Sequence, residues 1–548
     1  MQENKSRGAF SSKLGFVLAA AGSAVGLGNL WKFPYITWEN GGGIFVLVYL
    51  VCIVLVGFPV MIAEISIGKV SQKDPVGAFK VLDGIKSPFR FVGMLGVFGG
   101  FLILSYYSVV AGWSMEYIVR SGADSFRAVP RQEVSTLMQK EEMQDYAKKR
   151  IFAMQIQKPQ PDNIKEEILL DAGLIQQTTK KDAIYYDQVN EQYSKNLDIL
   201  PELLKKKKKL AKWQTYFYEQ FLKKKDAKTK LAKILLPKYS EQSFIDFISN
   251  GKKPLFWHTL FMLITLLIVI GGIQKGIEKA SKFIMPILFI IVGFMAINSL
   301  MLDKEQEGIR FLLIGMPEKL HGYSILEAMG HAFFTLSLGM GAMLTYGSYM
   351  QKHESVVKSA FWVTFLDTVI ALAACLMIFP ILFVYHLHPE SGSIGILFTS
   401  LPLELVKLPL GMMMAVIFYI LVFLAALTSA ISLLEVVVTY LADEMNFSRI
   451  KSTLIAALAI YLAGVPSAFS GDFLTMADHF ASRFVLPIGG LLIAIYAGYR
   501  MDKEILHKEF TDFGISEKVF RFFYFSVRYI TPVLVFLVFL TGIIGFGK

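Results

Sequence analysis

The stretch AGSAVGLGNLWKFP, residues 21–34, decides the fold of this protein. It lies in an apolar run that exceeds the roughly 20 residues needed to cross a bilayer, yet it contains Gly22, Gly26, Gly28, Lys32 and Pro34. A glycine costs about 1 kcal/mol inside a helix, and an unsatisfied backbone group costs several kcal/mol in hydrocarbon. The stretch therefore predicts a membrane helix that breaks where it lines a protected cavity.

A second stretch of the same kind lies at residues 333–349, FFTLSLGMGAMLTYGSY. It is interrupted by Gly339 and Gly341, beside the hydroxyl residues Thr335 and Ser337. For either stretch alone, glycines that let helices pack closely are an equally good interpretation. Two interrupted helices five spans apart instead favour two inverted repeats of five spans, with a transport site near the middle of the membrane.

The composition excludes several classes of protein. Of 548 residues, 54% are hydrophobic and only 18% are charged, and the mean hydropathy is +0.50. Soluble domains carry about 25% charged residues, so a soluble enzyme is excluded, and disorder requires a far less apolar chain. Cys52 and Cys375 lie in apolar runs without metal-ligand spacing, and we interpret them as small buried hydrophobic residues.

Eleven apolar stretches are long enough to span a membrane: 14–38, 42–69, 90–119, 255–273, 282–302, 324–350, 358–386, 408–441, 450–469, 473–499 and 520–546. The first is too long for a signal peptide and has no small-residue cleavage site. Basic residues concentrate in alternate short loops, beginning with Lys5, Arg7 and Lys13 before the first span. This pattern predicts a cytoplasmic N-terminus and, with eleven spans, an external C-terminus.

We therefore expect four parts: 1–119 with spans one to three, 120–254 as a polar insertion, 255–499 with spans four to ten, and 500–548 with span eleven and the C-terminus. The insertion lies outside by topology, and its stretches 133–157 and 198–236 have helical periodicity. It is interpreted as inert bulk, a partner-binding element or a lid over the entry path, and no partner is identified.

Most of the net charge of +11 belongs to this insertion. It has 27 Lys and Arg against 18 Asp and Glu, a net of +9, which leaves +2 for the remainder. Because the insertion is expected to face outward, its lysine runs are interpreted as a solvated surface, and no nucleic-acid partner is expected.

The broken spans predict a particular chemistry. Half-helix N-termini attract carboxylates, and unwound carbonyls offer hard oxygen ligands to a small cation. The hydroxyl and amide oxygens of Asn29, Thr335, Thr428 and Ser429 can complete sodium shells. Asp367 is an acid inside a span, which is a functional candidate by default. The alternative for Asp367 is a neutral carboxylic acid that only packs.

These residues occur in motifs that resemble the neurotransmitter:sodium symporter family, above all its bacterial leucine-transporter-like amino-acid symporters. The motifs are SKLGFVLAAAGSAVGLGNLWKFPY (12–35), ENGGGIFVLVYL (39–50), GFPVMIAEISIG (57–68), KGIEKASKFIMPILF (275–289), FFTLSLGMGAMLTYGSY (333–349) and LTSAISLLEVV (427–437). The resemblance covers about 1–119 and 255–546, everything except the insertion.

The resemblance implies an all-α polytopic membrane protein with a leucine-transporter-type fold: a 5+5 inverted repeat, an eleventh span and a helical external insertion. It implies a sodium-coupled amino-acid symporter of the plasma (inner) membrane, surrounded by the lipid bilayer. We find no nucleophile–base or metal-ligand motif that would suggest an enzyme, and no organic cofactor is expected. The alternative is a transporter-like receptor or partner-binding membrane protein that acts through the external insertion.

The resemblance also implies two sodium sites and a substrate site, residue by residue. The first sodium would be bound by Ala24, Asn29, Thr335 and Asp367, and the second by Gly22, Val25, Ala425, Thr428 and Ser429. The substrate would contact Ala24, Leu27, Gly28, Ile103, Tyr107, Phe334, Thr335, Ser337, Met340, Ser429 and Leu433.

The identity of two of these positions constrains the substrate. Monoamine-transporting members of the family have Asp where this chain has Gly26, so a substrate with its own carboxylate, an amino acid, is expected. The pocket set has no charged side chain, and a buried charge without a partner is costly. A neutral, hydrophobic L-amino acid is expected, and flexible Met340 in place of a Phe favours larger or aromatic side chains.

Asp367 departs from the Asn usual in the family, whose animal members bind chloride nearby. A fixed carboxylate can replace that anion, so chloride-independent transport is expected, and proton counter-transport through Asp367 is compatible with it. The resemblance further implies an outer gate between Lys32 and Asp478, and an inner gate between Arg7 and Asp443 with Ser348 and Tyr349 in support. Glu64 is expected to hold the broken backbone rather than a cation.

Overall fold

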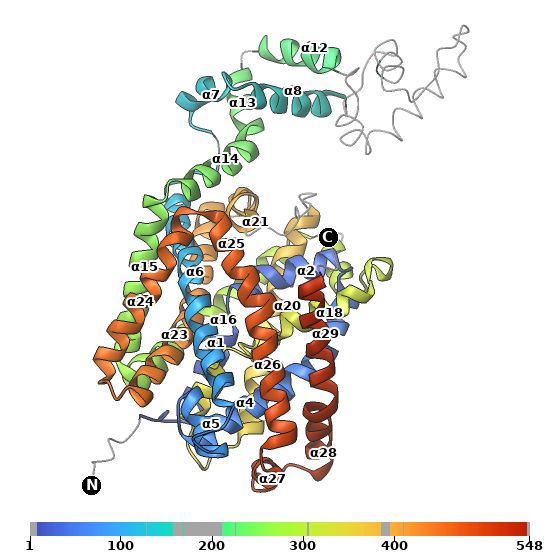
Figure 1. The fold of residues 1–548 in the computed structure, drawn as a ribbon. Coiled ribbons are helices and arrows are strands. Elements are labelled where there is room, and N and C mark those ends of the chain that lie inside the picture. The colour runs from blue at the N-terminus through green and yellow to red at the C-terminus, as the bar shows by residue number, and fades with distance from the viewer. Residues whose placement is uncertain are drawn as a thin grey trace. The chain divides into compact units, whose positions relative to one another are not determined.

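The structure, a computed structural model, describes residues 8–127, 129–156, 168, 211–224, 226–303, 306–384, 395–408 and 410–544. These residues form helices and connecting turns, with no strand among them. The chain divides into two compact units: Met1–Gly122, Ile245–Leu397 and Leu408–Lys548 form the first, and Ala123–Phe244 with Phe398–Lys407 form the second. The first unit carries the spans (Figure 1).

The helices of the first unit follow the chain in two series. Before residue 301 they are α1 (Lys13–Ala24), η1 (Gly28–Lys32), α2 (Phe33–Glu39), α3 (Gly43–Cys52), η2 (Ile53–Gly57), α4 (Phe58–Ser71), α5 (Pro75–Asp83), α6 (Arg90–Gly122), α15 (Lys252–Ile270), η4 (Ile273–Glu278) and α16 (Lys279–Leu300). After it they are α17 (Glu307–Leu313), η5 (Pro317–Lys319), α18 (Gly322–Thr335), α19 (Ala342–Gly347), α20 (Val356–Val384), α23 (Gly411–Glu444), α24 (Arg449–Phe469), α25 (Gly471–Phe480), η6 (Ala481–Val485), α26 (Leu486–Ile495), η7 (Tyr496–Arg500), α27 (Lys503–Thr511), α28 (Glu517–Phe525), η8 (Ser526–Ile530) and α29 (Thr531–Ile544).

Within the described residues, nine helices are long and apolar enough to cross a membrane, and a tenth candidate is the pair Lys13–Ala24 and Gly28–Glu39, bent by 52°. The one remaining predicted span, the sixth (324–350), consists of α18 and α19, which are 14 and 6 residues long. Neither is long enough alone, because the chain unwinds between Thr335 and Ala342. The two interruptions thus lie in the first and sixth predicted spans.

Small residues bring the broken sixth span against the second. A Cβ built on Gly68 of α4 would lie 2.0 Å from the carbonyl oxygen of Leu344, and one built on Gly347 of α19 would lie 2.5 Å from that of Ile65. The two helices therefore touch backbone to backbone, which only glycine allows. This contact holds α19 directly against α4.

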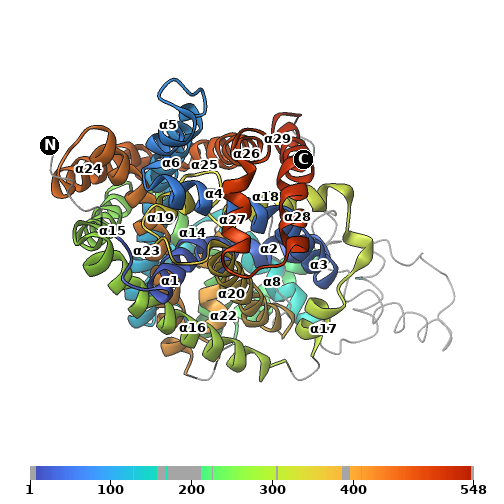
Figure 2. The ribbon, with the colours of Figure 1, turned by 90° about the horizontal axis from the view of Figure 1, so that it is seen from below.

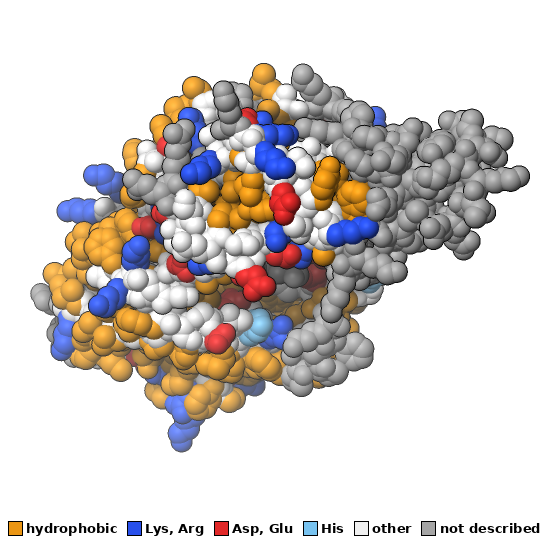
Figure 3. Space-filling model, turned by 90° about the horizontal axis from the view of Figure 1, so that it is seen from above, with side chains coloured by type: hydrophobic (Ala, Val, Ile, Leu, Met, Phe, Trp, Pro, Cys, Tyr) orange, Lys and Arg blue, Asp and Glu red, His pale blue; other side chains and the backbone are white. Residues whose placement is uncertain are grey.

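The outer surface of the spans is apolar, as lipid contact requires. Leu458 and Leu462 of α24, Met476 and Phe480 of α25 and Phe536 of α29 are all exposed. Hydrophobic side chains are extensive at the lower-left margin of the view in Figure 3, with a few Lys and Arg side chains among them. Cys52 and Cys375 are buried free thiols, which confirms their interpretation as buried hydrophobic residues.

The second unit has a hydrophobic core of its own, centred on Phe152, Phe217 and Leu235. Its helices are α7 (Arg131–Leu137), α8 (Glu141–Ile156), α12 (Ala211–Leu222), α13 (Ala227–Ile234), the first part of α14 (Leu236–Ser249), the end of α21 (Gly395–Phe398) and α22 (Leu401–Leu405). The unit lies within the predicted insertion 120–254 and also includes Phe398–Lys407, which sequence reasoning left in a separate loop. Residues 198–210 of the second predicted helical stretch lie outside the described residues.

Candidate functional site

The first interruption ends α1 at Ala24, where Val25 adopts extended backbone (φ −72°, ψ 103°). The Gly26 N–H, which would bond the Gly22 carbonyl in an unbroken helix, donates instead to Oδ1 of Asn29 at 2.9 Å. The Leu27 N–H likewise leaves the helical pattern and donates to the Tyr107 hydroxyl at 3.4 Å. The break therefore frees carbonyl groups at the end of α1 for other ligands.

The second interruption is held from two sides. Ser337, Gly339 and Gly341 have positive φ values of 53°, 76° and 75°, a region that glycine adopts freely. The Ser337 hydroxyl donates to the Ser23 carbonyl at 2.8 Å, and the Gly339 N–H donates to Oε1 of buried Glu64 at 2.7 Å. Glu64 thus supports the broken backbone, as its sequence context predicts.

Three predicted ligands of the first sodium lie in direct contact. Nδ2 of Asn29 donates to Oγ1 of Thr335 at 2.9 Å and to Oδ1 of Asp367 at 2.7 Å. The Thr335 hydroxyl donates to the same Oδ1 at 2.9 Å. The other carboxylate oxygen of Asp367, Oδ2, is buried without a hydrogen-bond partner in the described chain. A buried orphan oxygen beside amide and hydroxyl groups fits a small hard cation.

Predicted ligands of the second sodium converge beside the first break. The Thr428 hydroxyl donates to the Ala425 carbonyl at 3.0 Å and approaches the Val25 carbonyl at 3.5 Å. The Ser429 hydroxyl lies 3.5 Å from the Val25 carbonyl oxygen. Gly22 lies next to Thr428, because a Cβ built on Gly22 would lie 3.2 Å from Cβ of Thr428. Gly22 and Val25 thus lie close to Thr428 of α23, beside the first break.

All predicted substrate contacts line one cavity of about 30 Å³. Its walls are Ser23, Ala24, Gly26, Leu27, Gly28, Ile103, Tyr107, Phe334, Thr335, Ser337, Met340, Ser429 and Leu433. The predicted set did not contain Ser23 or Gly26. No wall residue carries a charge, and the polar groups are hydroxyls and backbone groups of the two breaks. The volume holds only about one or two water molecules, so a larger ligand requires the side chains to move.

The cavity leaves no room for a side chain on Gly26. A Cβ built there would lie 2.6 Å from Oγ of Ser429 and 3.2 Å from the hydroxyl oxygen of Tyr107. Real Cβ atoms essentially never approach a heavy atom closer than 3.0 Å. A side chain at position 26 would therefore require the side chain of Ser429 to move.

The predicted outer pair of Lys32 and Asp478 is not joined in this structure. Nζ of Lys32 lies 4.8 Å from the centroid of the Phe334 ring, and Oδ1 of Asp478 accepts a hydrogen bond from the Tyr106 hydroxyl at 3.0 Å. Sequence reasoning missed Tyr106, although it is adjacent in the same helix to Tyr107, which was predicted to contact the substrate.

The predicted inner pair of Arg7 and Asp443 stays a prediction. Arg7 lies outside the described residues, and Oδ2 of Asp443 accepts from the Asp74 N–H at 3.0 Å. The hydroxyl of Tyr349 donates to Oε1 of Glu435 at 2.7 Å, and the Ser348 hydroxyl donates to the Thr345 carbonyl. Tyr349 thus takes part in a hydrogen-bond network with Glu435.

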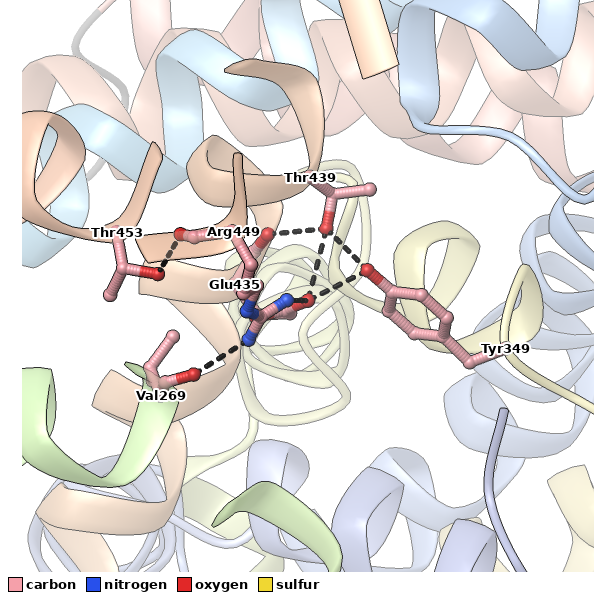
Figure 4. Close-up of polar contacts among 6 residues, drawn as sticks. All are labelled: Val269, Tyr349, Glu435, Thr439, Arg449 and Thr453. Carbon is pink, nitrogen blue, oxygen red and sulfur yellow. Dashed lines mark hydrogen bonds and ion pairs between the residues drawn. The ribbon is translucent and has the colours of Figure 1, made fainter. Parts of the chain in front are cut away.

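The centre of that network is an ion pair that sequence reasoning missed (Figure 4). Nη1 and Nη2 of Arg449 lie 2.6 and 2.5 Å from the two carboxylate oxygens of fully buried Glu435. Nη2 also donates to the Val269 carbonyl at 2.7 Å, and Oγ1 of Thr439 lies 2.9 Å from the Tyr349 hydroxyl. Glu435 is an acid within an apolar run, the signal that selected Asp367 and would have selected this residue too.

Removing one member of the pair is expected to cost more than removing both. Arg449→Ala leaves the buried Glu435 carboxylate unpaired, at a cost of about 3–5 kcal/mol, and lowers the melting temperature of the purified protein. Adding Glu435→Gln removes the unpaired carboxylate and recovers part of the lost stability. The measurement is thermal unfolding of both single variants and the double variant. A double variant no more stable than Arg449→Ala contradicts this account.

Asp74, outside the spans, is expected to make the stability of the protein depend on pH. Burial, with a smaller contribution from nearby Asp443, raises the pKa of Asp74 from 3.8 to about 7. A raised carboxyl pKa means that the native state holds a proton that the unfolded chain has lost, so stability falls as pH rises from about 4 to 7.

Asp74→Asn is expected to remove this pH dependence while keeping the cap at the start of α5, because Asn accepts the same backbone N–H bonds. The melting temperature of the variant, relative to the wild type, then rises between about pH 4 and 7 and is constant above. The exposed substitution Asp472→Asn is the control, with no such trend. Parallel wild-type and Asp74→Asn curves over this range exclude the assignment.

The comparisons with known proteins agree with this fold. The model of the sodium:neurotransmitter symporter family matches residues 7–164 and 187–548. The match includes most of 120–254, so the expectation that the insertion lies outside the family resemblance is wrong. A sodium-dependent transporter of Bacillus subtilis (strain 168) is 29% identical over 98% of both chains. Glycine transporter 2 of Xenopus laevis, sodium- and chloride-dependent, is 23% identical over 100% of this chain and 65% of its own.

A solved structure, MhsT in complex with L-phenylalanine, has a TM-score of 0.70 and 32% identity and covers 98% of this chain and 100% of its own. This match confirms the predicted leucine-transporter-type fold. The family match and the apolar helices indicate a multi-pass membrane transporter and not an enzyme, and the family implies sodium as the co-transported ion. The broken helices, the converging oxygen ligands and the family match lead to one conclusion: the chain belongs to the sodium:neurotransmitter symporter family.

Proposed function

We propose that this sodium-dependent symporter imports a neutral, hydrophobic or aromatic L-amino acid by alternating access. The main support for this substrate class is the cavity between the two breaks, whose thirteen wall residues include no charged side chain. The donors at its Leu27 end suit the substrate carboxylate, and Ile103, Met340 and Leu433 suit an apolar side chain. The solved neighbour was crystallised with L-phenylalanine, a substrate of this class.

Substrate entry requires the walls to move. Phe334 and Met340 border the small cavity, and Met340 has the flexible unbranched side chain that fits different shapes. Movement of these two side chains away from α6 makes space for a larger apolar group while the backbone donors stay in place.

We propose that two sodium ions are carried with the amino acid, one at Ala24, Asn29, Thr335 and Asp367 and one at Gly22, Val25, Ala425, Thr428 and Ser429. Both sets combine residues of the broken first span with residues of other helices. In the first set these helices are α18 and α20, and in the second set the helix is α23. A cation bound across these helices favours one relative position of them, which couples ion binding to the conformational change. The substrate carboxylate, held next to Ala24, completes the first set and makes the two bindings mutually dependent.

The two ends of the path differ in this structure. At the end where α1 begins, the Glu435–Arg449 pair and Tyr349 connect α23 and α24 to the segment after α19. At the other end Lys32 and Asp478 are separate. We propose that the first end faces the cytoplasm, with the N-terminus, and that the second unit is external. The structure then corresponds to a state closed to the cytoplasm, and formation of the Lys32–Asp478 pair closes the outer side.

The substrate proposal is tested by competition among the twenty amino acids for sodium-dependent phenylalanine uptake into proteoliposomes. We expect leucine, phenylalanine, tryptophan or tyrosine to compete best, and lysine and glutamate not to compete, because a charged side chain finds no partner in the cavity. Potassium in place of sodium is the control for coupling. Stronger competition by glycine or alanine than by any large apolar amino acid excludes the proposal.

A further inference from the structure

A second hollow lies on the membrane-facing side of α6, α23 and α24, away from the transport cavity. It has a volume of about 440 Å³, within the range of roughly 300–1,000 Å³ typical of ligand pockets. Its walls are Met94, Val97, Phe98, Phe101, Val437, Tyr440, Leu441, Ile455, Ala456 and Ala459. All but Tyr440 are purely apolar, so an apolar chain is the group that it accommodates. We call it the α6–α24 groove.

The groove opens toward lipid. Met94, Phe98 and Ile455 are 39%, 46% and 38% exposed, and all three helices are membrane spans. Both views of the ribbon place α6 close to α24 (Figures 1 and 2). Met94 to Phe101 lie four to eleven residues after the first residue of α6, about 6–16 Å along its axis. This depth corresponds to one leaflet of the bilayer core, about 15 Å thick.

Basic side chains precede the groove by one helical turn on two of its three helices. Arg90 stands four residues before Met94, and Lys451 stands four residues before Ile455, the spacing that places two side chains on one face of a helix. Both helices begin at the same end of the molecule, so the two cations border the same end of the groove.

In the part of the chain that the structure describes, neither cation is paired with a carboxylate. Arg90 contacts the Phe91 ring and the Ile85 carbonyl, and Lys451 lies 4.0 Å from the centroid of the Phe447 ring. Their basic neighbours are neutralised: Arg449 by Glu435, Lys80 by Glu444 and Arg500 by Asp83. Arg90 and Lys451 therefore keep their positive charges available to an anion near the apolar groove.

We propose that the α6–α24 groove binds an anionic phospholipid, with one acyl chain along the groove and the phosphate held by Arg90 and Lys451. Arginine bonds phosphate through two parallel N–H groups, and a membrane-surface lysine adds attraction to an anionic headgroup. The bound lipid packs against α6 and α23, the helices that also carry Tyr107 and Leu433 of the transport cavity.

Native mass spectrometry of the purified full-length chain tests this, with phosphatidylglycerol and phosphatidylcholine of the same acyl chains titrated separately. The wild type is expected to retain one phosphatidylglycerol in preference to phosphatidylcholine. Arg90→Gln with Lys451→Gln is expected to reduce that preference about thirtyfold, because each basic group contributes about fivefold. The matched control, Lys275→Gln with Lys279→Gln, removes two exposed charges from the α15–α16 region and is expected to keep the preference.

A groove-filling variant separates the acyl chain from the headgroup. Ala459→Trp is expected to weaken retention of both lipids while Arg90 and Lys451 remain. Retained phosphatidylcholine binding by the Arg90/Lys451 double variant shows that it is folded. Equal retention of the two lipids by the wild type, or an equal loss of preference in the control double variant, overturns the proposal. The readout is binding, so its failure is independent of any failure of the transport proposal.

Discussion

Gly26→Asp is expected to lower sodium-dependent amino-acid uptake by at least about tenfold. The Cβ alone would lie 2.6 Å from Oγ of Ser429, and the carboxylate would fill the space beside the Leu27 N–H where we place the substrate carboxylate. Overpacking of this kind costs about 1–3 kcal/mol for small groups, and the two like charges add repulsion. The measurement is phenylalanine uptake into proteoliposomes driven by a sodium gradient.

Two variants accompany this measurement. Gly26→Ala introduces only the Cβ and is expected to show an intermediate loss. Gly471→Asp makes the same change at the start of α25, where a Cβ meets nothing within 4 Å, and is expected to transport normally. Uptake by Gly26→Asp within twofold of the wild type is incompatible with a substrate carboxylate at this position.

Asp367→Asn is expected to make transport dependent on chloride. In the wild type a carboxylate stands beside Asn29 and Thr335. We propose that it balances the charge of the first sodium, so uptake is expected to be the same with chloride or gluconate. The variant loses that charge, and its uptake in gluconate falls by about 5–150-fold, the usual range of coupling between two sites. Added chloride restores part of it by supplying a mobile anion.

The uptake assay is run with and without chloride for the wild type, Asp367→Asn and the exposed control Asp472→Asn. The control is expected to match the wild type in both media. A wild type that itself requires chloride contradicts the assignment of Asp367. An Asp367→Asn variant that transports normally without chloride contradicts it equally.

The sequence predicted the first and sixth spans as the broken ones, because clustered glycines and polar residues are costly in an unbroken membrane helix. This local signal did not predict that Asn29, Thr335 and Asp367 lie near one another. Only the family resemblance predicted it. Asn29 and Asp367 are 338 residues apart, and no helical period relates them. The resemblance also could not set the boundary of the second unit, which includes Phe398–Lys407 from far along the chain.

By itself, the sequence determined the membrane class and the two breaks, because hydrophobicity, glycine and charge act over a few neighbouring positions. Only the tertiary structure decided which long side chains meet. It joined Glu435 to Arg449, gave Asp478 to Tyr106 rather than Lys32, and left Arg90 and Lys451 beside an apolar groove. An ion pair or a groove depends on the relative position of whole helices, and that position is set by the packing of the complete membrane core.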